Sequence, residues 1–225
     1  MLRAVLFDID GTLVDSNDLH ARAWQEAFAK FGFEIPFSRV RSQIGKGSDQ
    51  LLPALIGEVD AKRTGEKLAE YRSRLFQEKY LDQVRPFPRV RELFQRILRD
   101  GRKIALATSA SQEELSELKK IAHIDDLIHE ETSADDAEKS KPHPDIVASA
   151  LKRVAVHADE AVFVGDTPYD AMAATKIHVR TIGVLCGRFP EQELRKAGAM
   201  EIYESPSDLL ARYEKSALAE ASAAA

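Results

Sequence analysis

Two aspartates, Asp8 and Asp10, directly follow a short apolar run from Ala4 to Phe7 near the start of the chain. The run predicts a strand buried on both faces, as in a parallel sheet covered by helices. In an extended chain the two carboxylates point to the same side, and Gly11 then allows a sharp turn. Like charges at the end of a buried strand repel unless a cation lies between them or one holds a proton. The pair therefore predicts a metal site, an acid/base pair, or both.

Polar side chains also follow two other runs that predict buried strands. Thr108 and Ser109 follow the run 103–107, and Asp166 follows the run 161–165. In parallel sheets with alternating helices, ligands lie beyond the carboxyl ends of the strands. We therefore expect these side chains to meet the aspartate pair at one edge of a sheet. The alternative for each aspartate or threonine is that it caps the following turn or helix.

The elements that must position these residues fall into two patterns. The segment 15–83 has apolar residues at helical spacing and a loop with two glycines at 43–49, and no part of it predicts a strand. Pro86 and Pro88 then stop the helical pattern. Beyond them helices and strands alternate, which predicts βαβ units and a parallel sheet wrapped on both faces. We predict an α/β fold, with a doubly wound, Rossmann-like core formed by residues 1–15 and 86–225 and an inserted α-helical cap domain formed by residues 16–85.

Capping and turn residues set the expected ends of the later elements. Residues 111–114 form an expected capping box, Pro144 begins another helix, and the alanine-rich end from Ala217 is expected to fray. The strands expected after the first are 103–107, a brief one at 127–129, 161–165, 180–184 and a last short one at 201–203.

The composition is that of a globular chain. Of the 225 residues, 44% are hydrophobic and 31% charged, and no apolar run approaches the ~20 residues of a membrane helix. The N-terminus shows no signal-peptide pattern, and the single cysteine, Cys186, suits a reducing compartment, so we expect a cytoplasmic protein. A formal net charge of −5 argues against nucleic acid as a partner. We expect no membrane partner either, and a monomer or weak dimer.

Four motifs stand in order along the chain: FDIDGTLVDS at 7–16, IALATS at 104–109, KPHPD at 141–145 and VFVGDTPYD at 162–170. With a helical insert directly after the first, they resemble the haloacid dehalogenase superfamily. The resemblance is specifically to the branch with an α-helical cap, which includes phosphoglycolate phosphatase-like enzymes and β-phosphoglucomutase. One motif alone would be a weak indication, but four in order across nearly the whole chain are a strong one.

The resemblance implies a role for each motif residue. Asp8 would be the nucleophile that forms an aspartyl-phosphate, and Asp10 the general acid and then the base. Asp10 must first hold a proton, which a pKa raised by the neighbouring anions would help. Mg²⁺ would be held by the Asp8 carboxylate, the backbone carbonyl of Asp10 and Asp166. The remaining roles would be phosphate binding by Thr108, Ser109 and Lys141, and a supporting role for Asp170, either near the metal or orienting Lys141.

Differences within the family narrow the reaction. Dehalogenases lack the second aspartate, so Asp10 favours phosphate chemistry, and Lys46 is offset from the Schiff-base lysine of phosphonatases. Where the mutase has a cap arginine for a second phosphate this chain has Asp49, and where the mutase has Glu-Asp at the metal loop this chain has Gly165-Asp166. We therefore expect a Mg²⁺-dependent phosphatase acting on a small phosphorylated metabolite. The alternatives are a β-phosphoglucomutase-like mutase and, from a different class, a binding module without turnover.

The cap should select the substrate, because the core meets only the phosphoryl group. Movement at Ser16 and at 84–88 would admit the substrate. His20 could position Asp10 when the cap closes, the alternative being a histidine on the helix surface. The residues that could face the leaving group are Lys46, Ser48, and Trp24 or Arg22. The sequence does not rank the possible substrates.

Overall fold

Six parallel strands form the central sheet of the structure, a computed structural model that describes residues 1–219. Their order across the sheet is β5-β4-β1-β6-β7-β8. β1 lies between β4 and β6, and all four of its residues are buried, as the apolar run predicts. The strands are β1 (Ala4–Phe7), β4 (Lys103–Ala107), β5 (Glu130–Thr132), β6 (Ala161–Gly165), β7 (Arg180–Val184) and β8 (Ala199–Tyr203).

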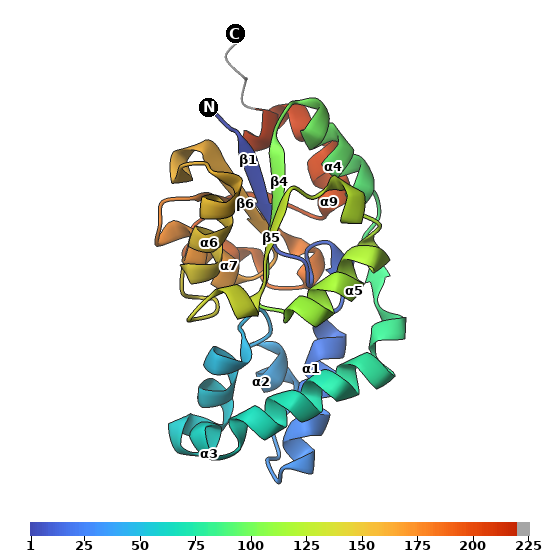
Figure 1. Cartoon of the computed structure of the whole chain (residues 1–225), viewed down its shortest axis with the longest axis vertical. Helices are drawn as coiled ribbons and strands as arrows, with labels where there is room; N and C mark the ends of the chain where they lie inside the picture. Colours follow the sequence, from blue (N-terminus) through green and yellow to red (C-terminus); the bar gives the residue numbers. More distant parts are fainter. Residues whose placement is uncertain (220–225) are drawn as a thin grey trace.

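Helices cover both faces of this sheet (Figure 1). Side chains alternate along β1, so Val5 and Phe7 enter one apolar cluster and Ala4 and Leu6 enter another. The first cluster includes helices α4 (Val90–Arg99), α5 (Gln112–Ala122) and α9 (Pro206–Ala211), and the second includes α6 (Asp145–Val154) and α7 (Pro168–Thr175). Helix α8 (Glu191–Ala197) packs against α7 and β8. This arrangement confirms the predicted doubly wound α/β fold.

Three helices lie together beyond one end of the sheet (Figure 1). They are α1 (Asn17–Lys30), α2 (Phe37–Arg41) and α3 (Ser48–Lys79), and α3 is kinked at Gly57. Apolar residues from all three and from the loops between them form a separate cluster, which includes Trp24, Phe28 and Leu68. We call these three helices and their loops the cap. The predicted domain boundaries at 15/16 and 85/86 stay a prediction.

A two-stranded antiparallel ribbon joins the cap to the sheet, where the chain enters and leaves the helical segment. It pairs β2 (Val14–Asp15) with β3 (Arg85–Pro86). The sequence did not predict this ribbon, because two-residue strands are too short to show a periodic pattern. It lies at the linkers where cap movement is expected.

Several expected element ends differ in the structure. The brief strand lies at 130–132 rather than 127–129, because 125–127 forms a 3₁₀ turn. Ser111 accepts a hydrogen bond from the Glu114 amide, but the Glu114 carboxylate bonds Arg72, so the expected capping box is only half formed. Residues 217–219 form a 3₁₀ turn with Leu218 fully buried, so the expected fraying is wrong there. Residues 220–225 lie outside the described residues. Further 3₁₀ turns lie at 81–83, 134–136, 158–160, 185–187 and 213–215.

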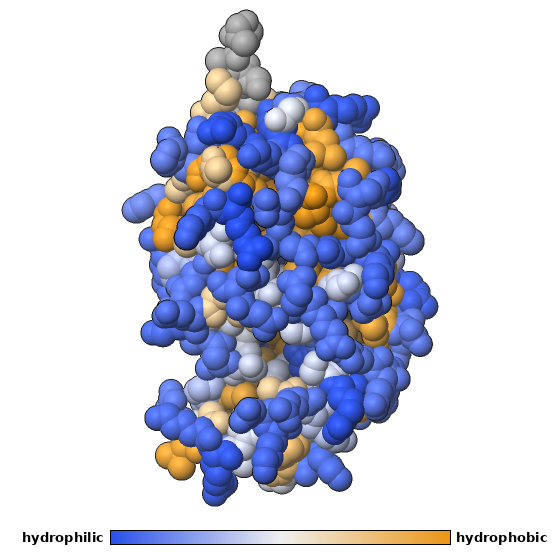
Figure 2. Space-filling model, in the orientation of Figure 1, coloured by the Kyte–Doolittle hydropathy of each residue, from blue (hydrophilic) through white to orange (hydrophobic). Residues whose placement is uncertain are grey.

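Hydrophilic side chains cover most of the face seen in Figure 2, and hydrophobic ones form separate patches. The outline narrows between the part that contains the sheet and the part that contains the cap. Among residues 1–219, no helix combines the length and apolar character that crossing a membrane requires.

Candidate active site

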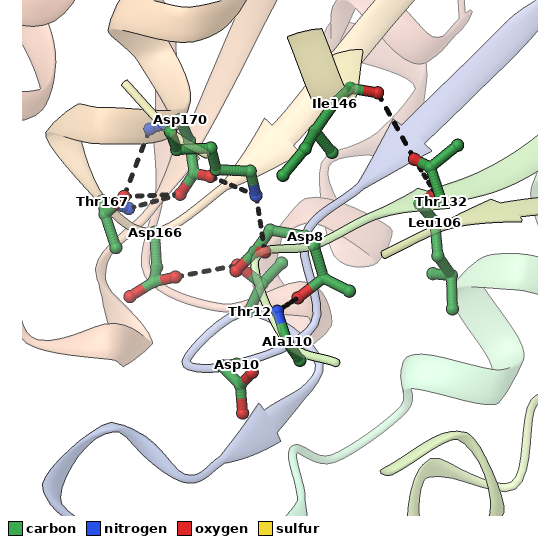
Figure 3. Close-up of polar contacts among 12 residues, drawn as sticks. Asp8, Asp10, Thr12, Leu106, Ala110, Thr132, Ile146, Asp166, Thr167 and Asp170 are labelled. Atoms are coloured by element: carbon green, nitrogen blue, oxygen red, sulfur yellow. Dashed lines mark hydrogen bonds and ion pairs between the residues drawn. The ribbon is translucent and has the colours of Figure 1, made fainter. Parts of the chain in front are cut away.

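Three neighbouring strands bring the polar residues at their ends together. Asp8 follows β1, Thr108 follows β4 and Asp166 follows β6, and β1 is hydrogen-bonded to both other strands. All three side chains are buried, with at most 5% of any one residue exposed. Figure 3 shows the side chains of Asp8, Asp166 and Asp170 close together beyond the strand ends. The structure thus places these residues at one edge of the sheet, as parallel strand ends should.

Lys141 reaches this edge from the loop before α6 and is completely buried. Its Nζ lies 2.7 Å from Asp8 Oδ1 and 2.8 Å from Asp170 Oδ1. Although burial alone would lower the pKa of Lys141, the charges of Asp170 and Asp8 outweigh it and hold the pKa above its usual value. The other oxygen of Asp170 accepts hydrogen bonds from the backbone and the hydroxyl of Thr167. Both Asp170 oxygens are therefore engaged, and Asp170 lies beside the lysine.

Asp8, Asp166 and Asp170 form a buried acidic cluster whose ligand oxygens lie within 4.8 Å of one another. Burial, followed by the charges of Asp170 and Asp10, raises the pKa of Asp8 to about 7 against the opposing effect of Lys141. Burial, Asp170 and Asp8 likewise raise the pKa of Asp166 well above its usual value. Lys141 supplies one positive charge to three carboxylates. This excess of buried oxygen ligands and negative charge fits a Mg²⁺ site made of Asp8 and Asp166.

The Asp10 side chain turns away from the acidic cluster toward α1. Its Oδ1 accepts a hydrogen bond from the Ser16 hydroxyl and lies 2.8 Å from His20 Nε2. The Asp10 carboxylate is thus not part of the cluster of Asp8, Asp166 and Asp170. Burial raises the pKa of Asp10, but His20, Ser16 and Arg72 outweigh that effect and the net pKa is lowered. The expected raised pKa is thus not found in the site without substrate.

His20 is buried and not a surface residue of its helix. Only 5% of it is exposed, and its ring stacks on Phe76 at 3.9 Å with an interplanar angle of 10°. The stack holds the ring with Nε2 toward Asp10. His20 thus links the start of the cap to the carboxylate that follows β1.

Thr108 and Ser109 lie on the loop after β4 and line the same cavity as Asp8. The Thr108 hydroxyl oxygen accepts a hydrogen bond from the Ala110 amide at 3.1 Å, which leaves its proton to donate (Figure 3). The Ser109 hydroxyl is buried and has no hydrogen-bond partner among residues 1–219. The cavity thus contains two hydroxyl groups that could donate hydrogen bonds to a phosphate.

The cavity lies between the sheet edge and the cap. Trp24 and Lys46 line it, whereas Ser48 lines an adjoining groove. Lys46 donates to Gln43 Oε1 at 2.6 Å, and burial lowers its pKa. Arg22 lines neither space, because it is exposed with its guanidinium 5.7 Å from the centre of the Phe37 ring.

Two cavity residues, Arg72 and Glu114, were not identified from the sequence. Arg72 of α3 stacks over the Trp24 ring at 4.9 Å and pairs with Glu114 of α5, which is buried. This pair joins cap and sheet helices from positions 42 residues apart. Each residue is an ordinary charged position on its own helix, so no local pattern distinguishes either one.

Other contacts hold the cap loop and α2 against the core. Asp49 Oδ2 accepts from the Ser140 amide at 3.1 Å, next to Lys141. The Tyr169 hydroxyl donates to the Ser42 carbonyl at 2.5 Å. Asp49 stands where the mutase has its phosphate-binding cap arginine, and here its carboxylate is bonded to the core backbone.

Comparison with known proteins identifies the class. A family described as haloacid dehalogenase-like hydrolase matches residues 5–184. The chain therefore belongs to the haloacid dehalogenase-like hydrolases, which confirms the family that its four motifs predicted and makes it an enzyme.

Several similar proteins have names that describe phosphatases or hydrolases. The chain is 31% identical over 197 residues to a putative pyrophosphatase PpaX of Caldanaerobacter subterraneus subsp. tengcongensis, covering 87% of each chain. It is also 31% identical over 191 residues to a phosphoglycolate phosphatase of Yersinia pestis, covering 83% of this chain and 82% of that one. Among solved structures, a hydrolase from Pseudomonas syringae matches with a TM-score of 0.89 and 29% identity, covering 95% of this chain and 98% of that one.

Proposed function

We propose that this hydrolase is a Mg²⁺-dependent phosphatase that cleaves a small phosphorylated metabolite through a phosphorylated Asp8. The observation that carries the proposal is the grouping of Asp8, Lys141 and Asp166 at the end of β1, with Asp10 held at the cap side of the same cavity. Phosphoryl transfer needs positioning and charge stabilisation more than covalent chemistry, and this grouping provides both.

In the first step, an Asp8 carboxylate oxygen attacks the phosphorus and the bond from phosphorus to the ester oxygen breaks. Lys141, Thr108 and Ser109 hold the non-bridging phosphoryl oxygens. Mg²⁺, held by Asp8, Asp166 and the Asp10 carbonyl, would supply positive charge against those oxygens when bound. The leaving oxygen takes a proton from the Asp10 carboxyl group, which the 2.8 Å contact between Oδ1 and His20 Nε2 holds in place, and Asp10 is left as a carboxylate.

In the second step, Asp10 acts as the base. It accepts a proton from a water molecule, whose oxygen attacks the phosphorus of the phosphorylated Asp8. The bond from phosphorus to the Asp8 oxygen breaks, which releases inorganic phosphate and restores the carboxylate. Ser16 and His20 both bond Oδ1 of Asp10, which leaves Oδ2 as the oxygen that exchanges protons with substrate and water.

The cap side of the cavity favours a leaving group with its own negative charge. Arg72 and Lys46 line it, and Arg72 is paired with Glu114, whereas no carboxylate among residues 1–219 forms an ion pair with Lys46, which is therefore the cation left to meet an anionic leaving group. The relatives named a pyrophosphatase and a phosphoglycolate phosphatase would both release an anion. We therefore propose phosphoglycolate and pyrophosphate as the first substrates to test.

The test is release of inorganic phosphate from a panel of phosphorylated metabolites, with Mg²⁺ and with EDTA. The panel includes the two substrates above, sugar and nucleotide phosphates, and β-glucose 1-phosphate with a trace of bisphosphate assayed for glucose 6-phosphate. We expect metal-dependent release from at least one class, and its loss by at least 10³-fold in Asp8→Asn, since that variant lacks the nucleophile.

Asp60→Asn is the matched control, because it makes the same chemical change at a cap surface ion pair. It should retain full activity. Isomerisation of the glucose phosphate without release would instead indicate a mutase. No turnover of any substrate by a protein that binds them would favour the binding-module alternative.

A further inference from the structure

Asp166 is enclosed by hydrogen-bond donors and by backbone. Its Oδ1 accepts from the Thr12 hydroxyl at 3.0 Å and its Oδ2 from Asn17 Nδ2 at 2.7 Å. Gly187 lies so close that a Cβ at that position would fall 1.7 Å from Oδ2. Each carboxylate oxygen therefore has one donor and one lone pair left for a cation, in a fixed orientation (Figure 3 shows the Thr12 contact).

Asn17 is the only asparagine in the chain. Its hydrogen-bond partners allow only one orientation of the side-chain amide. The nitrogen donates both to the Asp166 carboxylate and to the Gly187 carbonyl, at 3.2 Å. Both partners are acceptors, so only the amino end fits there. The amide oxygen is buried and has no partner among residues 1–219. It is an acceptor for a donor that the described residues do not supply, such as a water molecule.

The Gly187 carbonyl connects Asn17 and Asp166 to the cap. Asn17 is the first residue of α1, the helix that enters the cap. Arg41 of α2 donates to the Gly187 carbonyl, pairs with Asp18 at 2.7 Å, and stacks over the Phe189 ring at 4.9 Å. Asn17 of α1 and Arg41 of α2 thus both donate to the carbonyl of Gly187, the residue beside Asp166. Withdrawal of the cap would break the Arg41 contact and move the residue that orients Asp166.

We propose that Asn17 is a positioning residue that couples the cap to Asp166, so that divalent-metal affinity depends on the contacts of the closed cap. The inference rests on the proposed metal site and adds residues to it that touch no substrate. Groups that orient a metal ligand affect affinity directly, and coupling between two sites is reciprocal. Metal should therefore favour the closed cap to the same extent that the closed cap favours metal.

The experiment measures metal binding without substrate or turnover. Mn²⁺ and Mg²⁺ are titrated into the metal-free full chain by calorimetry, and the fluorescence of Trp24, the only tryptophan and a cavity residue, reports on the cap. We expect Asn17→Ala to weaken binding about 10-fold or more, Thr12→Val similarly, and Arg41→Gln roughly 3-fold because it acts through one further contact. The metal-induced fluorescence change should be lost in Asn17→Ala even at saturating metal.

Arg39→Gln, an exposed arginine on the same helix as Arg41, is the control and should bind as the wild type does. If the wild type binds metal and Asn17→Ala and Arg41→Gln bind equally well, the coupling is refuted and the proposed function stands. If the wild type itself binds no metal, the proposed metal site fails first. Should Asn17→Ala not fold, Arg41→Gln decides by the same criterion.

Discussion

Burial of Asp8 beside other carboxylates makes the stability of the folded chain depend on pH. Its pKa is raised to about 7, whereas an unfolded aspartate has a pKa of ~3.9. Below pH ~4 both states hold the proton, and as pH rises toward 7 only the unfolded chain releases it, so the contribution of Asp8 to stability is lost over that window. We predict that Asp8→Asn raises the free energy of unfolding at pH 7.5 in EDTA, with a difference that vanishes near pH 4. Urea unfolding at several pH values measures it.

Mg²⁺ should change the difference in stability between the wild type and Asp8→Asn in the opposite direction. A cation that binds the ionised carboxylate stabilises the folded wild type by mass action, so Mg²⁺ should narrow or reverse the difference from Asp8→Asn. Asp60→Asn serves as the control and should follow the wild type throughout. A wild type that is the more stable protein at pH 7.5 in EDTA would mean that the Lys141 pair, and not burial, determines the charge of Asp8.

At the scale of the elements, the loop between α2 and α3 can approach Thr167 closely because Gly45 has no side chain. Its φ is +103°, and a Cβ would lie 2.6 Å from Thr167 Cγ2. Thr167 holds Asp170, which in turn pairs with Lys141. We predict that Gly45→Ala lowers kcat/KM for phosphate release roughly 10-fold or more, because the loop that carries Lys46 must move back. Steady-state kinetics and thermal unfolding are measured together.

Gly57→Ala separates this effect from backbone strain. Gly57 also has a positive φ, +80°, but a Cβ there would meet nothing within 4 Å. Both variants should lose roughly 1–3 kcal/mol of stability, because a residue with a side chain rarely adopts a positive φ, and only Gly45→Ala should lose activity. Equal losses of kcat/KM would show that the close approach to Thr167 does not matter.

Local signals predicted the elements better than they predicted the contacts between them. The bounds of β4, β6 and β7 match the expected ones, and for β4 and β6 the reason is an apolar run followed directly by a polar residue, Thr108 or Asp166. The residues after β1, β4 and β6 were predictable as a site for the same reason. The pair of Arg72 and Glu114 was not, since it forms only when the cap lies against α5. The lowered pKa of Asp10 was missed for a related reason, because His20 and Arg72 come from the cap helices.

At the scale of the whole molecule, the sheet edge contacts the phosphoryl group of the substrate and the cap contacts its leaving group. The sheet edge contains the groups for the phosphoryl transfer, whereas Lys46 belongs to the cap side of the cavity, and no carboxylate among residues 1–219 forms an ion pair with it. Lys46→Ala should therefore raise KM about 10-fold for a substrate with an anionic leaving group, the loss of one charge-assisted hydrogen bond. KM for an aryl phosphate whose leaving group is uncharged, such as phenyl phosphate, should change less than about twofold, because its ring offers the Lys46 ammonium no acceptor.

Lys62→Ala removes the same charge from an exposed cap position outside both spaces that Lys46 lines. It should change neither KM, which excludes a general effect of the positive charge of the cap. If Lys46→Ala instead affects both substrates equally, Lys46 acts in holding the cap closed through Gln43 and the Tyr169 ring, 4.7 Å away. Selection would then have to come from Arg72, and the comparison of the two substrates would be repeated with Arg72→Met.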